Sequence, residues 1–319
     1  MTVLLGTLKT VALLIFYIAI GFILGRKKIV GEGASKTLAA VLTWVVMPMY
    51  SVATLSRSVT IEKISTYGKV FVAGIIIIAI CLAVCLPLSK AFAKSGYSRN
   101  IYKYLLFTPN MGYFGYPIVE AVFGQDILAM YMIFTLPTSI CINTFGYMIL
   151  TDKNADGGTK SGKKDLLKRI FSLPMIGTFV GLTIGLLPIE LPEIVYDFLQ
   201  PAGDCMRAIA MLLTGIVLSG LGFKTLFSSK KAYAVSIVRL IIYPIVFGGL
   251  TYALYLLGID KEIFILTICL TALPAGMNVV VFPESIGLSG KEGAQACFIS
   301  YVMVIVTLPL VFLAMNALL

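Results

Sequence analysis

The sequence of 319 residues contains no histidine, and Asp, Glu, Lys and Arg together make up only 13% of it. Its six cysteines form no Cys-x-x-Cys pair, and without histidine they match none of the common zinc-site patterns. The chain also lacks a Gly-x-Ser-x-Gly motif and a Walker A loop, which serine hydrolases and ATP-driven pumps require. We therefore predict a protein that is not an enzyme and that holds no metal and no cofactor.

Hydrophobic residues are abundant instead, at 59% of the chain with a mean hydropathy of +0.98. A soluble protein of this size needs more charge to cover its surface. Ten apolar segments are each long enough to cross a hydrocarbon core about 30 Å thick. They lie near residues 8–25, 36–55, 68–90, 101–123, 127–150, 170–187, 194–221, 232–257, 263–283 and 294–318. We therefore predict an all-α polytopic membrane protein whose surroundings are the lipid bilayer.

The basic residues indicate the orientation in the membrane. The net charge of +10 is concentrated in short loops between spans, which is the usual membrane pattern and gives no support to nucleic-acid binding. The loops on one side hold 18 of the 25 Lys and Arg residues, and the opposite side holds five. Positive loops face the cytoplasm. We expect a multi-pass protein of the cytoplasmic membrane with both termini extracytoplasmic.

One long polar connection, residues 152–169, divides the chain into two parts. It is rich in Gly and Lys and is predicted to be a cytoplasmic linker between residues 1–151 and residues 170–319. Each part holds five spans, and an odd number means that a repeated half is inserted upside down. The pattern predicts a 5+5 inverted repeat, an arrangement found in many secondary transporters.

Two of the spans contain residues that disfavour helix. The fourth reads "TPNMGYFGYP" and the ninth "LPAGMNVVVFP", each with two prolines around Gly and Asn. At 1.5 Å per residue both breaks lie roughly 14–22 Å deep, near the midplane. We expect the two broken helices to cross near Gly112–Pro117 and Gly276–Val280, with helix N-termini aimed at an anion. Ordinary proline kinks are the alternative.

The segments "PNMGYFGYP", "LPAGMN" and the opening "GFILGRKKIVGEGASKTLAAVLTWVVMPMYSVATLS" resemble the auxin efflux carrier family, which includes bacterial organic-acid permeases and the plant PIN proteins. The resemblance implies a scaffold of spans 1, 2, 6 and 7 and a transport domain of spans 3–5 and 8–10 in an elevator fold like that of bile-acid sodium symporters. It also implies a homodimer built on spans 2 and 7. Val279 stands where the plant members have proline, which argues against auxin itself as the substrate.

Candidate site residues follow from the two broken spans. We expect Asn110 and Asn278 to donate hydrogen bonds to a substrate carboxylate. The full predicted set is Asn110, Gly112, Gly115, Pro117, Pro274, Gly276 and Asn278. Glu120 is either a coupling site for a proton or a hydrated acid near the interface. Asp204 and Arg207 are spaced to pair on one helix face, and Arg239 either snorkels to the interface or attracts an anion.

The leading hypothesis is a secondary transporter for a small organic anion, a carboxylate such as malate or malonate or an auxin-like weak acid. Coupling to H⁺ or Na⁺ is open. The first alternative is a sodium-coupled organic anion symporter of the bile-acid type. A passive channel is the alternative from a different class, because paired broken helices also occur in pores.

Overall fold

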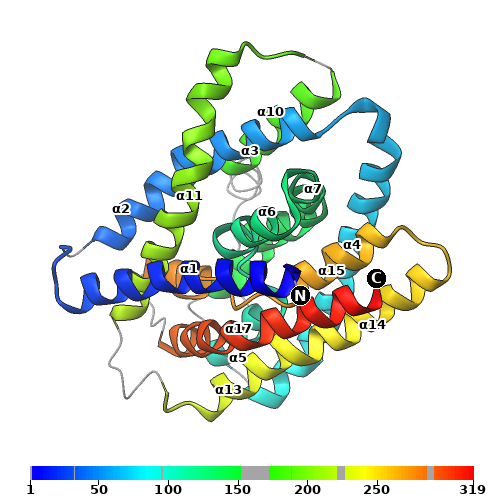
Figure 1. Cartoon of the computed structure of the whole chain (residues 1–319). Helices are drawn as coiled ribbons and strands as arrows, with labels where there is room; N and C mark the ends of the chain where they lie inside the picture. The colour runs from blue at the N-terminus through cyan, green and yellow to red at the C-terminus, as the bar shows by residue number, and fades with distance from the viewer. Residues whose placement is uncertain are drawn as a thin grey trace.

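The computed structural model describes residues 2–31, 33–94, 96–151, 172–187, 189–220, 227–285 and 291–319, and these residues are almost entirely helical (Figure 1). The predicted linker, 152–169, lies outside the described residues. The all-helical class follows from the long apolar segments, because a backbone in lipid must satisfy its hydrogen bonds within the segment.

The described part of the first half contains eight α-helices with three π-helical turns and one 3₁₀ turn between them. They are α1 (Thr2–Arg26), α2 (Ala34–Val41), η1 (Leu42–Val46), α3 (Met47–Ser58), η2 (Ile61–Lys63), α4 (Ile64–Phe92), α5 (Gly96–Phe107), η3 (Met111–Gly115), α6 (Tyr116–Phe123), α7 (Gln125–Cys141), η4 (Ile142–Gly146) and α8 (Tyr147–Thr151).

The described part of the second half holds seven α-helices and one π-helical turn. They are α10 (Leu173–Leu186), α11 (Glu193–Ser219), α13 (Lys230–Ile237), η5 (Val238–Ile242), α14 (Tyr243–Leu256), α15 (Lys261–Thr271), α16 (Asn278–Ser285) and α17 (Lys291–Leu318). A π-helical turn joins two consecutive α-helices into one continuous helix in several places; for example, η5 joins α13 to α14.

In the described part of the chain, six continuous helical segments are long and apolar enough to cross a membrane. They are Ala34–Ser58, Ile61–Phe92, Gln125–Leu150, Glu193–Ser219, Lys230–Leu256 and Lys291–Leu318, and two shorter apolar helices are Val11–Arg26 and Leu173–Leu186. The two other predicted spans, 101–123 and 263–283, are interrupted. An interrupted span is too short on either side of the break to cross the hydrocarbon by itself.

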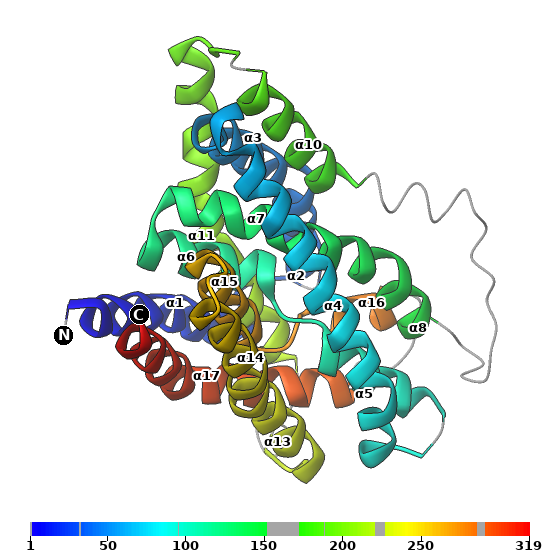
Figure 2. The same ribbon diagram turned by 90° about the vertical axis from the view of Figure 1, so that its right-hand side faces the viewer.

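Helices from the two halves pack against one another. α3 lies against α10 and α11 in the upper part of Figure 2, and α1, lower in that view, lies against α11. α4 packs on α5 and α7, while α14 packs on α15 and α13 on α17. The beginning of α1 and the end of α17 lie side by side in both views (Figures 1 and 2).

A glycine stripe sets the distance between α10 and α3. A Cβ atom on Gly177, Gly181 or Gly185 would come within 2.8 Å of a backbone atom of α3 or of the residue that follows it. Small residues let membrane helices approach closely, and van der Waals contact then holds them together. The α3–α10 pair is therefore fixed by backbone contact.

Candidate functional site

Two helix interruptions meet in the middle of the molecule. α5 ends at Phe107 and η3 begins at Met111, while α15 ends at Thr271 and α16 begins at Asn278. The Asn110 amide donates to the Pro274 carbonyl at 2.9 Å, and the Gly276 amide donates to the Thr108 carbonyl at 3.1 Å. These bonds form an isolated antiparallel β-bridge between Pro109 and Ala275. The predicted breaks in both spans are confirmed.

The pairing falls just before the predicted crossing residues of the first break, Gly112–Pro117, and at the start of those of the second, Gly276–Val280, where the Gly276 amide forms one of the two bonds. Gly112 lies inside η3, Pro117 lies in the first turn of α6, and Val280 lies in α16, so none of these is at the bridge. The reason is that proline has no N–H to donate. Each helix therefore ends shortly before the first proline of its motif, α5 at Phe107 before Pro109 and α15 at Thr271 before Pro274.

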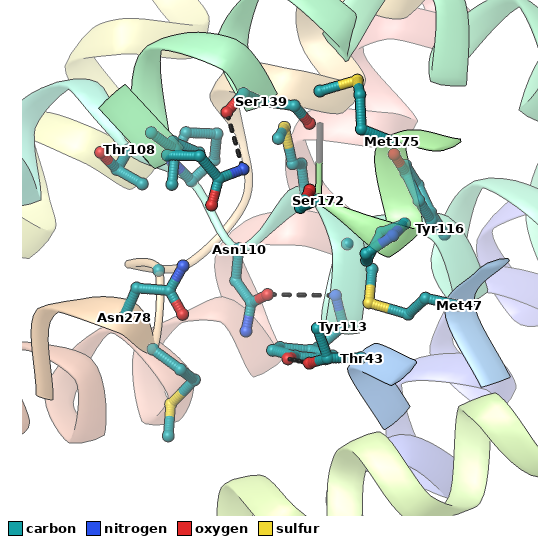
Figure 3. A pocket seen from close by; sticks show the side chains of 18 of the residues that line it. Thr43, Met47, Thr108, Asn110, Tyr113, Tyr116, Ser139, Ser172, Met175 and Asn278 are labelled. Atoms are coloured by element: carbon teal, nitrogen blue, oxygen red, sulfur yellow. Dashed lines mark hydrogen bonds between the residues drawn. The ribbon is translucent and has the colours of Figure 1, made fainter. Parts of the chain in front are cut away.

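A cavity of about 260 Å³ opens beside the bridge. Its lining comes from α2–α3, α10 and α11 on one side and from α5, η3, α7, η4 and α16 on the other. Figure 3 shows the polar side chains that gather around it. The lining polar residues are Thr43, Ser51, Tyr104, Thr108, Asn110, Tyr113, Tyr116, Ser139, Asn143, Ser172, Thr178 and Asn278, and none of the described residues in the lining is charged.

Asn110 lines this cavity, but its side chain already has partners within the protein. Its Oδ1 accepts from the Tyr113 amide at 3.2 Å, which caps the start of η3, and its Nδ2 donates to the Tyr301 hydroxyl. The residue is only 3% exposed. Asn110 therefore holds the break in shape, and one N–H of its amide group is left for another acceptor.

Asn278 lies at the start of α16 on the same cavity wall (Figure 3). The Tyr104 hydroxyl faces it and Thr108. Among the described residues the buried hydroxyls of Tyr104 and Thr108 form no hydrogen bond with full distance and angle geometry. Buried polar groups in native proteins are normally paired. These three side chains therefore present hydrogen-bonding capacity on the cavity wall.

The two half-helix N-termini both border the cavity. The first amides of η3, at Met111 and Gly112, are those that a helix start leaves without an intrahelical partner, and both residues line the cavity. At the second break the Val279 and Val280 amides donate to the carbonyls of Gly276 and Met277. Met277 and Asn278, which precede these two residues, also line the cavity, so backbone amides at the start of both half-helices lie at its wall.

The other predicted site residues are glycines and prolines that shape the backbone around the two breaks. Gly276 lines the cavity beside the bridge. Gly115 faces away from the cavity, since a Cβ there would meet the Leu273 side chain at 2.7 Å and the Tyr131 hydroxyl at 2.9 Å. Pro117 begins α6, and Pro274 supplies the carbonyl that accepts from Asn110.

Glu120 lies near the far end of α6 and does not line the cavity. Its carboxylate accepts from the Tyr50 hydroxyl of α3 at 2.7 Å and from the Gln125 amide at 2.5 Å. A coupling role stays a prediction. Glu120 is half-buried, so the hypothesis of a hydrated acid near the interface also stays a prediction.

Arg239 is buried and is not among the residues that line the cavity, so the snorkelling interpretation is wrong, while attraction of an anion stays a prediction. It is 3% exposed, and its Nη1 donates to the carbonyls of Leu105 and Leu106 at 3.1 and 3.2 Å. The reason is the break itself, which leaves these carbonyls without their intrahelical donors. The predicted pair of Asp204 and Arg207 concerns side chains that lie outside the described part of the structure.

The sequence reasoning missed the polar residues that other spans contribute to the cavity. Thr43 of η1 bonds the Tyr113 hydroxyl at 3.2 Å, and Asn143 of η4 donates to the Ser139 carbonyl at 3.0 Å (Figure 3). π-Helical turns are rare and are frequent at functional sites. The available signal was the run of Ser, Thr and Asn in "TSICINT", which is unusual within an apolar span.

Comparison with known proteins identifies the family of the chain. The model of the family described as "Membrane transport protein" matches residues 7–312. An "Uncharacterized transporter" of Methanothermobacter thermautotrophicus is 24% identical over 311 residues, covering 96% of this chain and 97% of that protein. The chain therefore belongs to the membrane transport protein family, the auxin efflux carrier family that its motifs resemble.

Proposed function

We propose that this protein is a secondary transporter that moves a small organic anion across the cytoplasmic membrane, and that the cavity beside the bridge is its substrate site. The observation that carries the proposal is the pairing of two interrupted helices at the wall of a polar cavity. Irregular backbone at membrane depth persists where it is buried in protein or lines a wet cavity. Transporter binding sites are built in this way from broken helices.

The lining favours one kind of carboxylate. Five methionines surround the polar groups: Met47, Met111, Met132, Met175 and Met277. Because no described lining residue is charged, a second carboxylate group would lose its water without gaining a counter-ion. A singly charged acid with an apolar body, resembling an auxin-like weak acid, fits this lining better than malate or malonate.

The mechanism that we propose is elevator-type alternating access in a ten-span, 5+5 inverted repeat. The scaffold would consist of α1, α2–α3, α10 and α11, and the transport domain of the other helices. The cavity supports this division because both groups line it. Exposed apolar side chains on η1 and α11, such as Trp44 at 68% and Phe198 at 71%, provide a face for a homodimer.

Uptake into vesicles tests the proposal. Purified protein in liposomes should take up labelled phenylacetate saturably, show counterflow, and discriminate against malate. Asn278→Ala should weaken uptake, while Ile245→Ala, a change on the lipid-exposed face of α14, should not. Non-saturable flux would indicate a channel. Uptake that requires an inward sodium gradient would indicate the sodium-coupled symporter, and stronger uptake of malate would contradict the assigned substrate class.

A further inference from the structure

Arg239 satisfies two carbonyl groups that the helix interruption leaves open. In an unbroken helix the amide of residue 109 would donate to Leu105, and the amide of residue 110 would donate to Leu106. Pro109 has no N–H, and the Asn110 amide donates to Pro274 instead. Arg239 of η5 donates to these same two carbonyls. The guanidinium therefore caps the C-terminus of α5.

No carboxylate of the described residues neutralises the charge of Arg239. Among the described residues the ion pairs are Lys63–Asp126 and Lys69–Asp260, and neither involves Arg239. The Nε atom of Arg239 has no hydrogen-bond partner among the residues that the structure describes. A buried cation is costly unless nearby groups compensate it, and the negative end of a helix dipole does so partly. A positive charge consequently stays beside the crossing helices.

The crossing helices by themselves have no preferred sign of charge. Two helix N-termini and two C-termini meet there, and each end is equivalent to roughly half an elementary charge. The two positive and two negative ends cancel. At the second C-terminus the described contacts are neutral: Ser300 accepts from the Ala275 amide at 3.1 Å. An additional positive charge favours an anion at this position, and Arg239 provides one.

We infer that Arg239 is the positioning residue that makes the crossing electropositive, and so sets the preference of the cavity for anions without touching the substrate. This inference rests on the proposed function, because it states which residue makes the proposed substrate site prefer anions. The effect of the Arg239 charge on the cavity can be measured without any substrate.

A cysteine introduced in the cavity reports the local charge. Ser139 lines the cavity, and the Ser139→Cys thiol reacts with a small neutral alkylating reagent only as thiolate, which a nearby positive charge favours. Mass spectrometry separates this site from the native cysteines. Ser65→Cys, exposed at the start of α4, is the matched control.

With Arg239→Gln, alkylation at Ser139→Cys should slow by about tenfold at fixed pH, the factor that one pKa unit represents. Arg239→Lys, which keeps the charge, should stay within about twofold of the parent, and Ser65→Cys should not change with either variant. Arg239→Met is a second neutral variant should Gln not fold. If neither neutral variant folds while Lys does, the need for a positive charge here is supported.

A folded Gln or Met variant that alkylates Ser139→Cys at the parental rate would overturn the inference. The second arm compares phenylacetate with its uncharged amide by thermal shift, where Arg239→Gln should remove the preference for the acid. If the alkylation effect appears but the parent protein binds neither probe, the electrostatic role of Arg239 stands and the proposed carboxylate function fails.

Discussion

Tyr50 of α3 donates a hydrogen bond of 2.7 Å to the Glu120 carboxylate of α6. The Tyr50 ring also lies 6.4 Å from the ring of Tyr116, centroid to centroid, and Tyr116 lines the cavity. This contact joins an ionisable residue of the proposed transport domain to the proposed scaffold. Movement of one group of helices against the other must break it.

Energetic coupling between these two residues should be measurable. In a double-mutant cycle of Tyr50→Phe and Glu120→Gln, we expect a coupling of about 1 kcal/mol in the free energy of unfolding, because a hydrogen bond to a charged group is lost in a half-buried setting. Thermal unfolding in detergent measures it. The cycle of Tyr50→Phe with Asp126→Asn should be additive, and additivity in the first cycle would show that the contact contributes nothing.

The two asparagines should respond differently to truncation. Asn278→Ala should weaken phenylacetate binding about tenfold or more, a loss of about 1.5–3 kcal/mol for an unmatched charge, with the melting temperature unchanged. Asn110→Ala should also lower the melting temperature, because its side chain caps η3 and bonds Tyr301, and a lost N-cap costs about 1 kcal/mol.

Asp at position 278 should bind the acid more weakly than Ala, since like charges repel. Calorimetric titration and differential scanning fluorimetry together separate binding from stability. If both Ala variants bind as the parent does, the interrupted helices are structural and the binding site lies elsewhere.

Close packing of α10 on α3 predicts a sharp contrast between two glycines. Gly181→Ala should destabilise the protein by about 1–3 kcal/mol, because the added Cβ would lie 2.8 Å from the Ser51 carbonyl oxygen. Gly249→Ala meets nothing within 4 Å and should be neutral or stabilise the helix α14. Thermal unfolding compares the two variants, and equal melting temperatures would disprove backbone contact as the determinant.

Membrane topology can be tested with single added cysteines. Lys160→Cys should react with an impermeant maleimide only from the cytoplasmic side, and Glu190→Cys only from outside, because the basic loops face the cytoplasm. Site-resolved mass spectrometry excludes the native cysteines. Labelling of Glu190→Cys exclusively from inside would reverse the proposed orientation.

Local rules determined much of this protein from its sequence. The length of the apolar segments specified helices, because lipid offers no partner for free backbone groups. Pro109 and Pro274 indicated where two helices are interrupted, because the absence of an N–H on proline follows from the residue type alone. The motifs around them also indicated the family, which the match over residues 7–312 shows.

Tertiary structure alone decided where the freed backbone groups find partners. Arg239 and the carbonyls it caps are 134 and 133 positions apart in the chain, and Asn110 meets Tyr301 across 191 positions. No periodicity or propensity encodes such distances. Sequence patterns reveal that a hydrogen bond is lost at a proline, but folding determines which residue replaces it. For this reason the sequence did not reveal that Asn110 caps η3 and bonds Tyr301, or that Arg239 bonds the carbonyls of Leu105 and Leu106.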